Sequence, residues 1–230
     1  MVENIPEELL CSSDKSAPIA LTSAITSNIQ EDNISQTAAQ PPKITIYCKA
    51  EYRPKIIDKP YPVPGKTPNP NDGDRRYLLF TKEAFETLLV CIEWGKLTEE
   101  NEVEQGGVLL GTVEQYKNEI YSFVEDILLA DTRGKSASVE FKPEMWADMQ
   151  SRLANINKER NSADKLFITG WFHTHPKSIP VFMSGTDIKT QQLNFWQNWQ
   201  ASLVLNPHMQ EYRTFFGEEA MEGKVVIIDF

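Results

Sequence analysis

Short apolar runs that end in glycine or proline constrain the fold of this 230-residue chain more than any other feature. Residues 106–111 read Gly-Gly-Val-Leu-Leu-Gly, and a second run, residues 166–175, is stopped by Pro176. Apolar runs of this length between such breakers are typical of strands. We therefore predict a strand at each of the two runs.

Helical patterns alternate with these strands. Apolar residues between positions 85 and 92 recur at i, i+3, i+4 and i+7, and Thr81 and Gly95 are placed to begin and end this helix. A second stripe begins at Pro143 and continues to about residue 160, and Ser184 is placed to open a third helix toward Trp199. Further strands are predicted at 77–80, 120–129, 138–141, 201–205 and 224–228. The fold class we expect is α+β, a mixed β-sheet flanked by helices.

The N-terminal part of the chain differs from the rest in composition. Residues 1–42 hold six acidic residues, one lysine and no aromatic residue, so they are predicted to form a disordered acidic arm. Residues 43–76 combine a β-branched segment at 43–48 with six prolines and an Asn-Asp-Gly-Asp turn, and we expect a strand followed by an extended connector. Residues 77–230 are expected to form the folded domain.

Charge and cysteine content exclude several classes of protein. The formal net charge of −10 argues against nucleic acid or a membrane surface as a partner and favours a partner with a basic surface. The three cysteines, Cys11, Cys48 and Cys91, are scattered, so neither a disulfide framework nor a cysteine metal clip is expected. No apolar stretch is long enough to span a bilayer and the N-terminus does not resemble a signal peptide, so we expect a cytoplasmic protein.

Two of the three histidines, His173 and His175, stand at the end of the predicted strand 166–175. On a strand, residues i and i+2 face the same side about 6.5 Å apart, which lets both imidazoles reach one metal ion. A catalytic zinc site needs a third protein ligand, and Asp187 is the candidate at the start of the next helix. The His-x-His pattern alone fits a structural or surface role equally well.

Two further polar groups have both an ordinary and a catalytic interpretation. Ser184 and Asp187 have the spacing of a helix N-cap, a role that is compatible with Asp187 also reaching a metal. Glu104 ends an acidic run, which by default is a solvated loop, but it directly precedes the predicted strand at 106–111. A carboxylate beside a metal-activated water can act as general base and acid. Composition does not choose between Glu104, Glu102 and Glu125 for this role.

Taken together, these segments resemble the JAMM (JAB1/MPN/Mov34) family of zinc metalloproteases. The resemblance covers about residues 77–216 and rests on Glu104 before Gln-Gly-Gly, on Gly-Trp-Phe-His-Thr-His-Pro at 170–176, and on Ser-Gly-Thr-Asp at 184–187. It implies a zinc site with His173, His175 and Asp187 as ligands, Glu104 as the acid/base, and Ser184 as a hydrogen-bond donor to the developing oxyanion. The amino-acid sequence of the histidine motif is most similar to that of bacterial members found with ubiquitin-like conjugation genes.

The activity implied by this resemblance is hydrolysis of the bond after the C-terminal glycine of ubiquitin or a ubiquitin-like protein. The expected partners are then a ubiquitin-like protein and its conjugates, with an activating or conjugating enzyme encoded nearby. Two other functions stay open. One is a metal-free binding scaffold with the same fold, and the other is an amidase that acts on another small substrate, because a fold does not fix a substrate.

Overall fold

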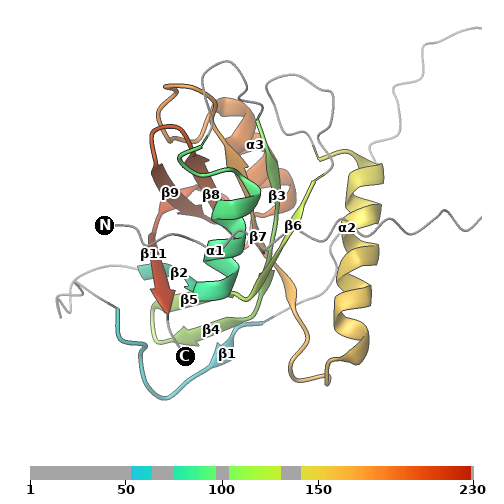
Figure 1. Ribbon diagram of the computed structural model, residues 1–230. Coiled ribbons are helices and arrows are strands. Elements are labelled where there is room, and N and C mark those ends of the chain that lie inside the picture. Colours follow the sequence, from blue (N-terminus) through green and yellow to red (C-terminus); the bar gives the residue numbers. More distant parts are fainter. Residues whose placement is uncertain (1–52, 64–74, 97–103, 131–140, 229–230) are drawn as a thin grey trace, which may run out of the picture. The chain divides into compact units, whose positions relative to one another are not determined.

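The computed structural model describes residues 53–63, 75–96, 104–130 and 141–228 (Figure 1). The predicted acidic arm at 1–42, the predicted strand at 43–48, Glu102 and residues 138–140 of another predicted strand lie outside these ranges. In the described part of the chain, no helix is both long and apolar enough to cross a membrane.

The described residues form two mixed β-sheets and three α-helices, so the α+β class is confirmed. The strands are β1 (Lys55–Ile56), β2 (Arg75–Thr81), β3 (Gly106–Gly111), β4 (Val113–Tyr116), β5 (Glu119–Val124), β6 (Asp126–Leu129), β7 (Phe167–Thr174), β8 (Ala201–Asn206), β9 (Glu211–Phe216), β10 (Met221–Glu222) and β11 (Lys224–Ile228). The helices are α1 (Lys82–Cys91), α2 (Pro143–Ile156), a short 3-10 turn (Asn157–Glu159) and α3 (Gly185–Asn194).

The smaller sheet has the strand order β1-β4-β5-β2-β11. Its edge strand β1 pairs in parallel with β4, and it comes from the segment that the sequence predicted to be an extended connector. Tyr61 and Val63 follow β1 and pack on this sheet against Tyr77 and Tyr121. Part of the proline-rich region therefore covers the domain instead of only linking to it.

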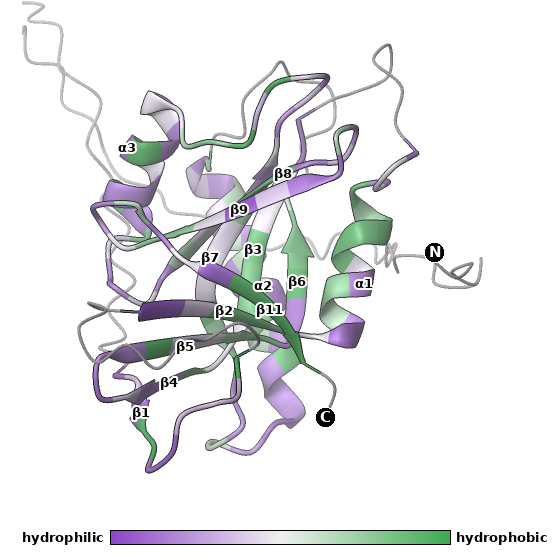
Figure 2. Ribbon diagram, turned by 90° about the vertical axis from the view of Figure 1, so that its left-hand side faces the viewer, coloured by the Kyte–Doolittle hydropathy of each residue, from purple (hydrophilic) through white to green (hydrophobic). Residues whose placement is uncertain are grey.

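The larger sheet has the strand order β10-β9-β8-β7-β3-β6, and apolar residues cover both of its faces. Leu109 and Phe172 face a cluster that includes Leu88 of α1, whereas Val108 and Trp171 face a cluster built around α2. Burial on both sides explains why β3 and β7 read as nearly continuous apolar runs. In Figure 2, β3 and β6 are accordingly coloured largely hydrophobic.

Close packing of strands at the centre of this sheet requires glycine at one position beside the site described below. A Cβ atom on Gly107 would overlap the Leu128 carbonyl oxygen of β6 and the Phe172 ring of β7. A side chain at this position would push the neighbouring strands apart. The glycine therefore serves the pairing of β3 with both of its neighbours.

The predicted helices and most predicted strands are confirmed, with differences in one helix and in several strands. Thr81 caps α1 through a hydrogen bond from the Ala84 amide, as expected. The third helix is shorter than expected, because α3 ends at Asn194 and the Phe195 side chain then turns into the core beside α2. The strands β1, β4, β9 and β10 were not predicted, and the strand expected at 120–129 is divided into β5 and β6.

Candidate metal centre

Pairing of β3 with β7 brings two of the sequence motifs together. Gly106 is paired with His173 in the antiparallel ladder, and just beyond it the Thr174 amide donates to the Gln105 carbonyl oxygen at 2.8 Å. The Gln105 amide also donates to the Thr174 hydroxyl at 2.8 Å. Since directly paired residues share a face and side chains alternate along a strand, Glu104 enters on the face that carries His173 and His175.

The helix α3 supplies the third motif through its N-terminus. Ser184 is the N-cap, and it forms a capping box with Asp187. The Asp187 amide donates to Ser184 Oγ at 3.3 Å, and the Ser184 amide donates to Asp187 Oδ2 at 2.7 Å. The predicted capping role is therefore confirmed. It fixes the Asp187 carboxylate at the start of the helix, where a negative charge is favoured.

His173, His175 and Asp187 meet at one point, where their ligand atoms all lie within 4.8 Å of one another. The two Nε2 atoms are 3.3 Å apart, and His173 Nε2 lies 3.5 Å from Asp187 Oδ2. Two ligand atoms that bind zinc tetrahedrally at 2.0–2.1 Å are separated by about 3.3 Å. The spacing and the donor set therefore fit a zinc ion, and this group could hold one.

The charge states of two of these residues suit a metal ligand, which must be deprotonated. Burial and the neighbouring His173 lower the pKa of His175, which favours the neutral imidazole. Burial raises the pKa of Asp187, but hydrogen bonds from His173 and Ser184 outweigh it and bring this pKa to about 2. Asp187 is therefore a carboxylate at neutral pH.

Glu104 lies near Asp187 and differs from it in protonation. Burial and then the charge of Asp187 raise the pKa of Glu104 to about 7. Its Oε2 atom is buried and has no hydrogen-bond partner among the residues that the structure describes. A buried carboxyl oxygen without a partner is costly unless it serves a ligand or a reaction.

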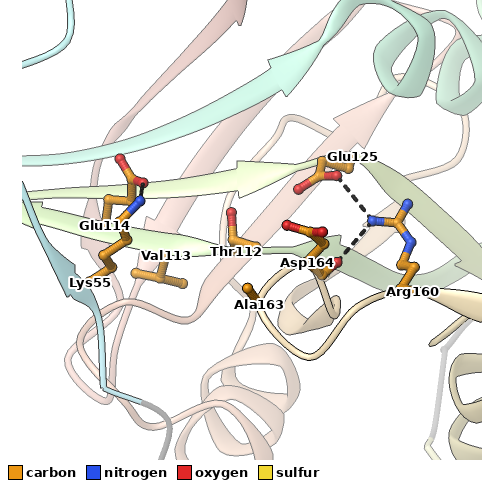
Figure 3. A pocket seen from close by; sticks show the side chains of 8 residues that line it. All are labelled: Lys55, Thr112, Val113, Glu114, Glu125, Arg160, Ala163 and Asp164. Atoms are coloured by element: carbon orange, nitrogen blue, oxygen red, sulfur yellow. Dashed lines mark hydrogen bonds and ion pairs between the residues drawn. The ribbon is translucent and has the colours of Figure 1, made fainter.

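The other two carboxylates considered for the acid/base role are not part of this group. Glu102 lies outside the described residues, and Glu125 lies at the opposite end of β3. There it lines a hollow of about 400 Å³ together with seven other residues: Lys55, Thr112, Val113, Glu114, Arg160, Ala163 and Asp164 (Figure 3). In this hollow Glu125 is ion-paired with Arg160 at 3.4 Å.

Several residues that surround the group were not identified from the sequence. The Pro180 carbonyl oxygen lies 2.6 Å from His175 Nδ1, and the Trp171 ring stacks on His173. Gln191 is fully buried and contacts Trp171. The only local signal for Gln191 is its position one helical turn after Asp187, which does not distinguish it from an ordinary polar residue of a helix.

Comparison with protein families agrees with this geometry. The sequence model of the family described as JAB1/Mov34/MPN/PAD-1 ubiquitin protease matches residues 85–197, a range that includes Glu104 and the whole His-His-Asp group. Residues 85–197 of this chain therefore form a domain of the JAMM/MPN family. A comparison with curated proteins finds no match to the chain.

The class of protein follows from the fold and the site together. This chain carries a JAB/MPN domain, a type known in peptidases that act on ubiquitin and in non-catalytic proteins, and it retains three residues that could hold a metal ion.

Proposed function

We propose that this protein is a zinc-dependent isopeptidase or peptidase that hydrolyses the bond after the C-terminal glycine of ubiquitin or a ubiquitin-like protein. One observation carries the proposal: a buried carboxyl group with a pKa of about 7 and an unpartnered oxygen among the described residues lies near a complete His-His-Asp group. A binding scaffold has no use for this combination, whereas a hydrolase needs both parts.

His173, His175 and Asp187 would hold the zinc ion. When bound by three protein ligands, zinc lowers the pKa of a coordinated water to about 7 and polarises a carbonyl group. The hydrogen bond between His175 Nδ1 and the Pro180 carbonyl supports this assignment, because it leaves Nε2 of that ring deprotonated and facing the other two ligands.

Glu104 acts as the general base and then as the general acid. Its carboxylate accepts a proton from the attacking water, whose oxygen forms a bond to the carbonyl carbon of the substrate glycine. Glu104 then donates this proton to the leaving amine as the carbon–nitrogen bond breaks. In the metal-free protein burial and the charge of Asp187 raise the pKa of Glu104 to about 7, and a raised pKa suits a group that must both accept and donate a proton near neutral pH.

Ser184 stabilises the negative charge that develops on the carbonyl oxygen. Its Oγ atom accepts a hydrogen bond from the Asp187 amide, and within the described ranges its hydroxyl hydrogen has no acceptor. The hydroxyl is thus held in place and free to donate to the substrate. A preorganised donor of this kind contributes about 3–4 kcal/mol to transition-state stabilisation.

The experiment that tests the proposal compares Glu104→Gln with a matched carboxylate change in the distant hollow, Glu125→Gln. The zinc-loaded full-length protein is assayed for release of ubiquitin or ubiquitin-like proteins from an isopeptide-linked amine. Glu104→Gln should retain zinc and substrate affinity but lose turnover by about 10²–10⁴-fold, the range for removing a positioned acid/base. Glu125→Gln should turn over like the wild type.

Two outcomes contradict the proposal in different ways. Unchanged turnover in Glu104→Gln would refute the acid/base role while leaving the peptidase assignment in place. A zinc-loaded wild-type protein that releases nothing from any modifier, yet binds one of them, would indicate a scaffold.

A further inference from the structure

The two histidines of the metal centre are oriented by different means. His175 has an acceptor for its second ring nitrogen, since Nδ1 lies 2.6 Å from the Pro180 carbonyl oxygen. His173 is 1% exposed, and its Nδ1 atom has no hydrogen-bond partner among the described residues. Metal-binding histidines usually have their ring plane fixed by a hydrogen bond at this nitrogen. Another contact must therefore fix the ring plane of His173.

The Trp171 ring provides that contact. It stacks on the His173 ring with the centroids 4.7 Å apart and the planes inclined by 17°. Trp171 is itself 1% exposed, and it also stacks on Phe195 at 5.8 Å and 17°. The two residues stand at i and i+2 on β7, so they share the face that looks toward α3.

Gln191 holds the Trp171 ring through its single polar atom. Trp171 Nε1 donates to Gln191 Oε1 at 2.8 Å, while Gln191 Nε2 donates to the carbonyl oxygens of Phe195 and Gln200 at 2.7 and 3.1 Å. Both carbonyls can only accept, so the amide nitrogen must face them and the amide oxygen must face the indole. All the polar atoms of this buried side chain are therefore satisfied in one orientation only.

The same contact links the helix that carries Asp187 to the strand that carries the histidines. Asp187 and Gln191 are one turn apart on α3 and lie on the same face of the helix. They contact His173 and Trp171, which are two residues apart on β7. The two contacts lie side by side between α3 and β7. The hydrogen bond between Trp171 and Gln191 therefore sets the distance between Asp187 and His173.

We infer that Trp171 and Gln191 are positioning residues of the metal centre: the hydrogen bond between them fixes α3 against β7, and the indole ring fixes the plane of the His173 imidazole. This inference rests on the proposed metal centre, and it goes beyond that proposal by assigning a function to two residues that do not touch the ion. Residues that orient metal ligands typically change metal affinity by about 10–100-fold when they are replaced.

The test measures zinc affinity of the full-length protein by competition with a chelating dye. Trp171→Phe retains an aromatic ring but removes the donor, and Gln191→Met retains the volume but removes the acceptor. Each should weaken zinc binding by about 10-fold or more, and the double variant should weaken it no further than Gln191→Met alone, because both single changes remove the same hydrogen bond between the two residues. Trp171→Leu, which also removes the stacked ring, should weaken binding more than Trp171→Phe.

Trp146→Phe is the control for general loss of packing. Trp146 is 4% exposed and its ring packs on Phe141 and Phe195 in the same cluster. In the described part of the chain, its ring stacks on neither His173 nor Trp171. It should lower the melting temperature while zinc affinity stays within about twofold of the wild type. With cobalt in place of zinc, the visible absorption should change in the Trp171 and Gln191 variants but not in Trp146→Phe, because this spectrum depends on ligand geometry.

The outcomes separate the inference from the proposal on which it rests. Zinc affinity that falls in proportion to melting temperature in all variants, Trp146→Phe included, would reduce the contact to ordinary packing and overturn the inference alone. A wild-type protein that binds no zinc would refute the metal centre and the positioning role together.

Discussion

The polar groups at the two ends of β3 differ in whether they have hydrogen-bond partners. At Gly106, where β3 begins, the site holds Glu104 Oε2 and His173 Nδ1, two buried atoms without partners among the described residues. Beyond Gly111, where the strand ends, charged residues also line the hollow of Figure 3, but these groups bond to one another. Arg160 donates to Glu125 and to the Asp164 carbonyl, and Lys55 pairs with Glu114.

This contrast shows which observation indicates chemistry. A concave surface is the usual starting point for the search for a functional site, but the hollow at the second end is lined by partly exposed ion pairs. The first end is marked instead by buried polar atoms whose bonding capacity is unused and by a carboxyl group whose pKa is raised to about 7. Buried polar atoms without hydrogen-bond partners destabilise a fold, so their presence indicates a functional site better than a concave surface does.

The largest expected effect concerns metal binding at the first end. We expect about one equivalent of zinc per wild-type chain, and none in the double variant His173→Ala, His175→Ala, because the ligand set is then incomplete. Zinc at about 100 times its Kd should stabilise the wild type by about 2.7 kcal/mol and raise Tm by about 5–11 °C. Thermal melts with zinc and with a chelator, together with metal analysis, measure this.

The control for this prediction is an equivalent change of the third histidine. His208→Ala should keep both the zinc and the shift in Tm, since His208 is not one of the grouped ligands. Full zinc occupancy in the His173, His175 double variant would mean that the metal is bound by other residues.

An intermediate effect is expected from Glu104 in the metal-free protein. Its pKa of about 7 lies above the ordinary value of 4.5, so the folded state binds more protons than the unfolded state between these values. Stability from this group is therefore present below pH 4.5 and is lost as the pH rises to about 7. Glutamine at this position does not ionise, so Glu104→Gln avoids the destabilisation at high pH. In excess chelator the variant should be more stable than the wild type by about 1–2 kcal/mol at pH 8, but hardly at pH 4.

Chemical denaturation of wild type and variant at both pH values measures this difference. Glu125→Gln makes the same chemical change at the other end of β3, and we expect no comparable gain at pH 8. If Glu104→Gln had the same effect at both pH values, its carboxyl group would not be buried as the structure indicates.

The sequence predicted those parts of the site that depend on local geometry. The alternation of side chains on a strand placed His173 and His175 on one face, and the capping spacing placed Asp187 beside Ser184. Local pattern did not choose Glu104 over Glu125, and only the family resemblance pointed to Glu104. The physical reason lies in the register of β3 against β7, where Gly106 pairs with His173 more than 60 positions away in the chain. Periodicity and propensity carry no information on such a register.

The unpredicted strands show the same limit. β4 reads Val-Glu-Gln-Tyr and β9 reads Glu-Tyr-Arg-Thr-Phe-Phe, so polar residues make up about half of each strand and neither forms a continuous apolar run. They are strands because β5 and β8 offer backbone groups with which to pair. Gln191 was missed for a related reason, since its role depends on Trp171, which another element supplies.

The smallest effect is expected at the second end of β3, from the pair of Arg160 and Glu125. Their side chains are 34% and 35% exposed, and at 3.4 Å their charges are screened by water and salt. Arg160→Ala, Glu125→Gln and the double variant should give a coupling free energy below about 1 kcal/mol, smaller still in high salt, with zinc content and turnover unchanged. Denaturant unfolding of the wild type and the three variants measures the free energies for this double-mutant cycle, and the isopeptide assay measures turnover. A loss of turnover in Glu125→Gln comparable to that in Glu104→Gln would place chemistry in the hollow and would remove the distinction between partnered and unpartnered groups on which the assignment of the active end depends.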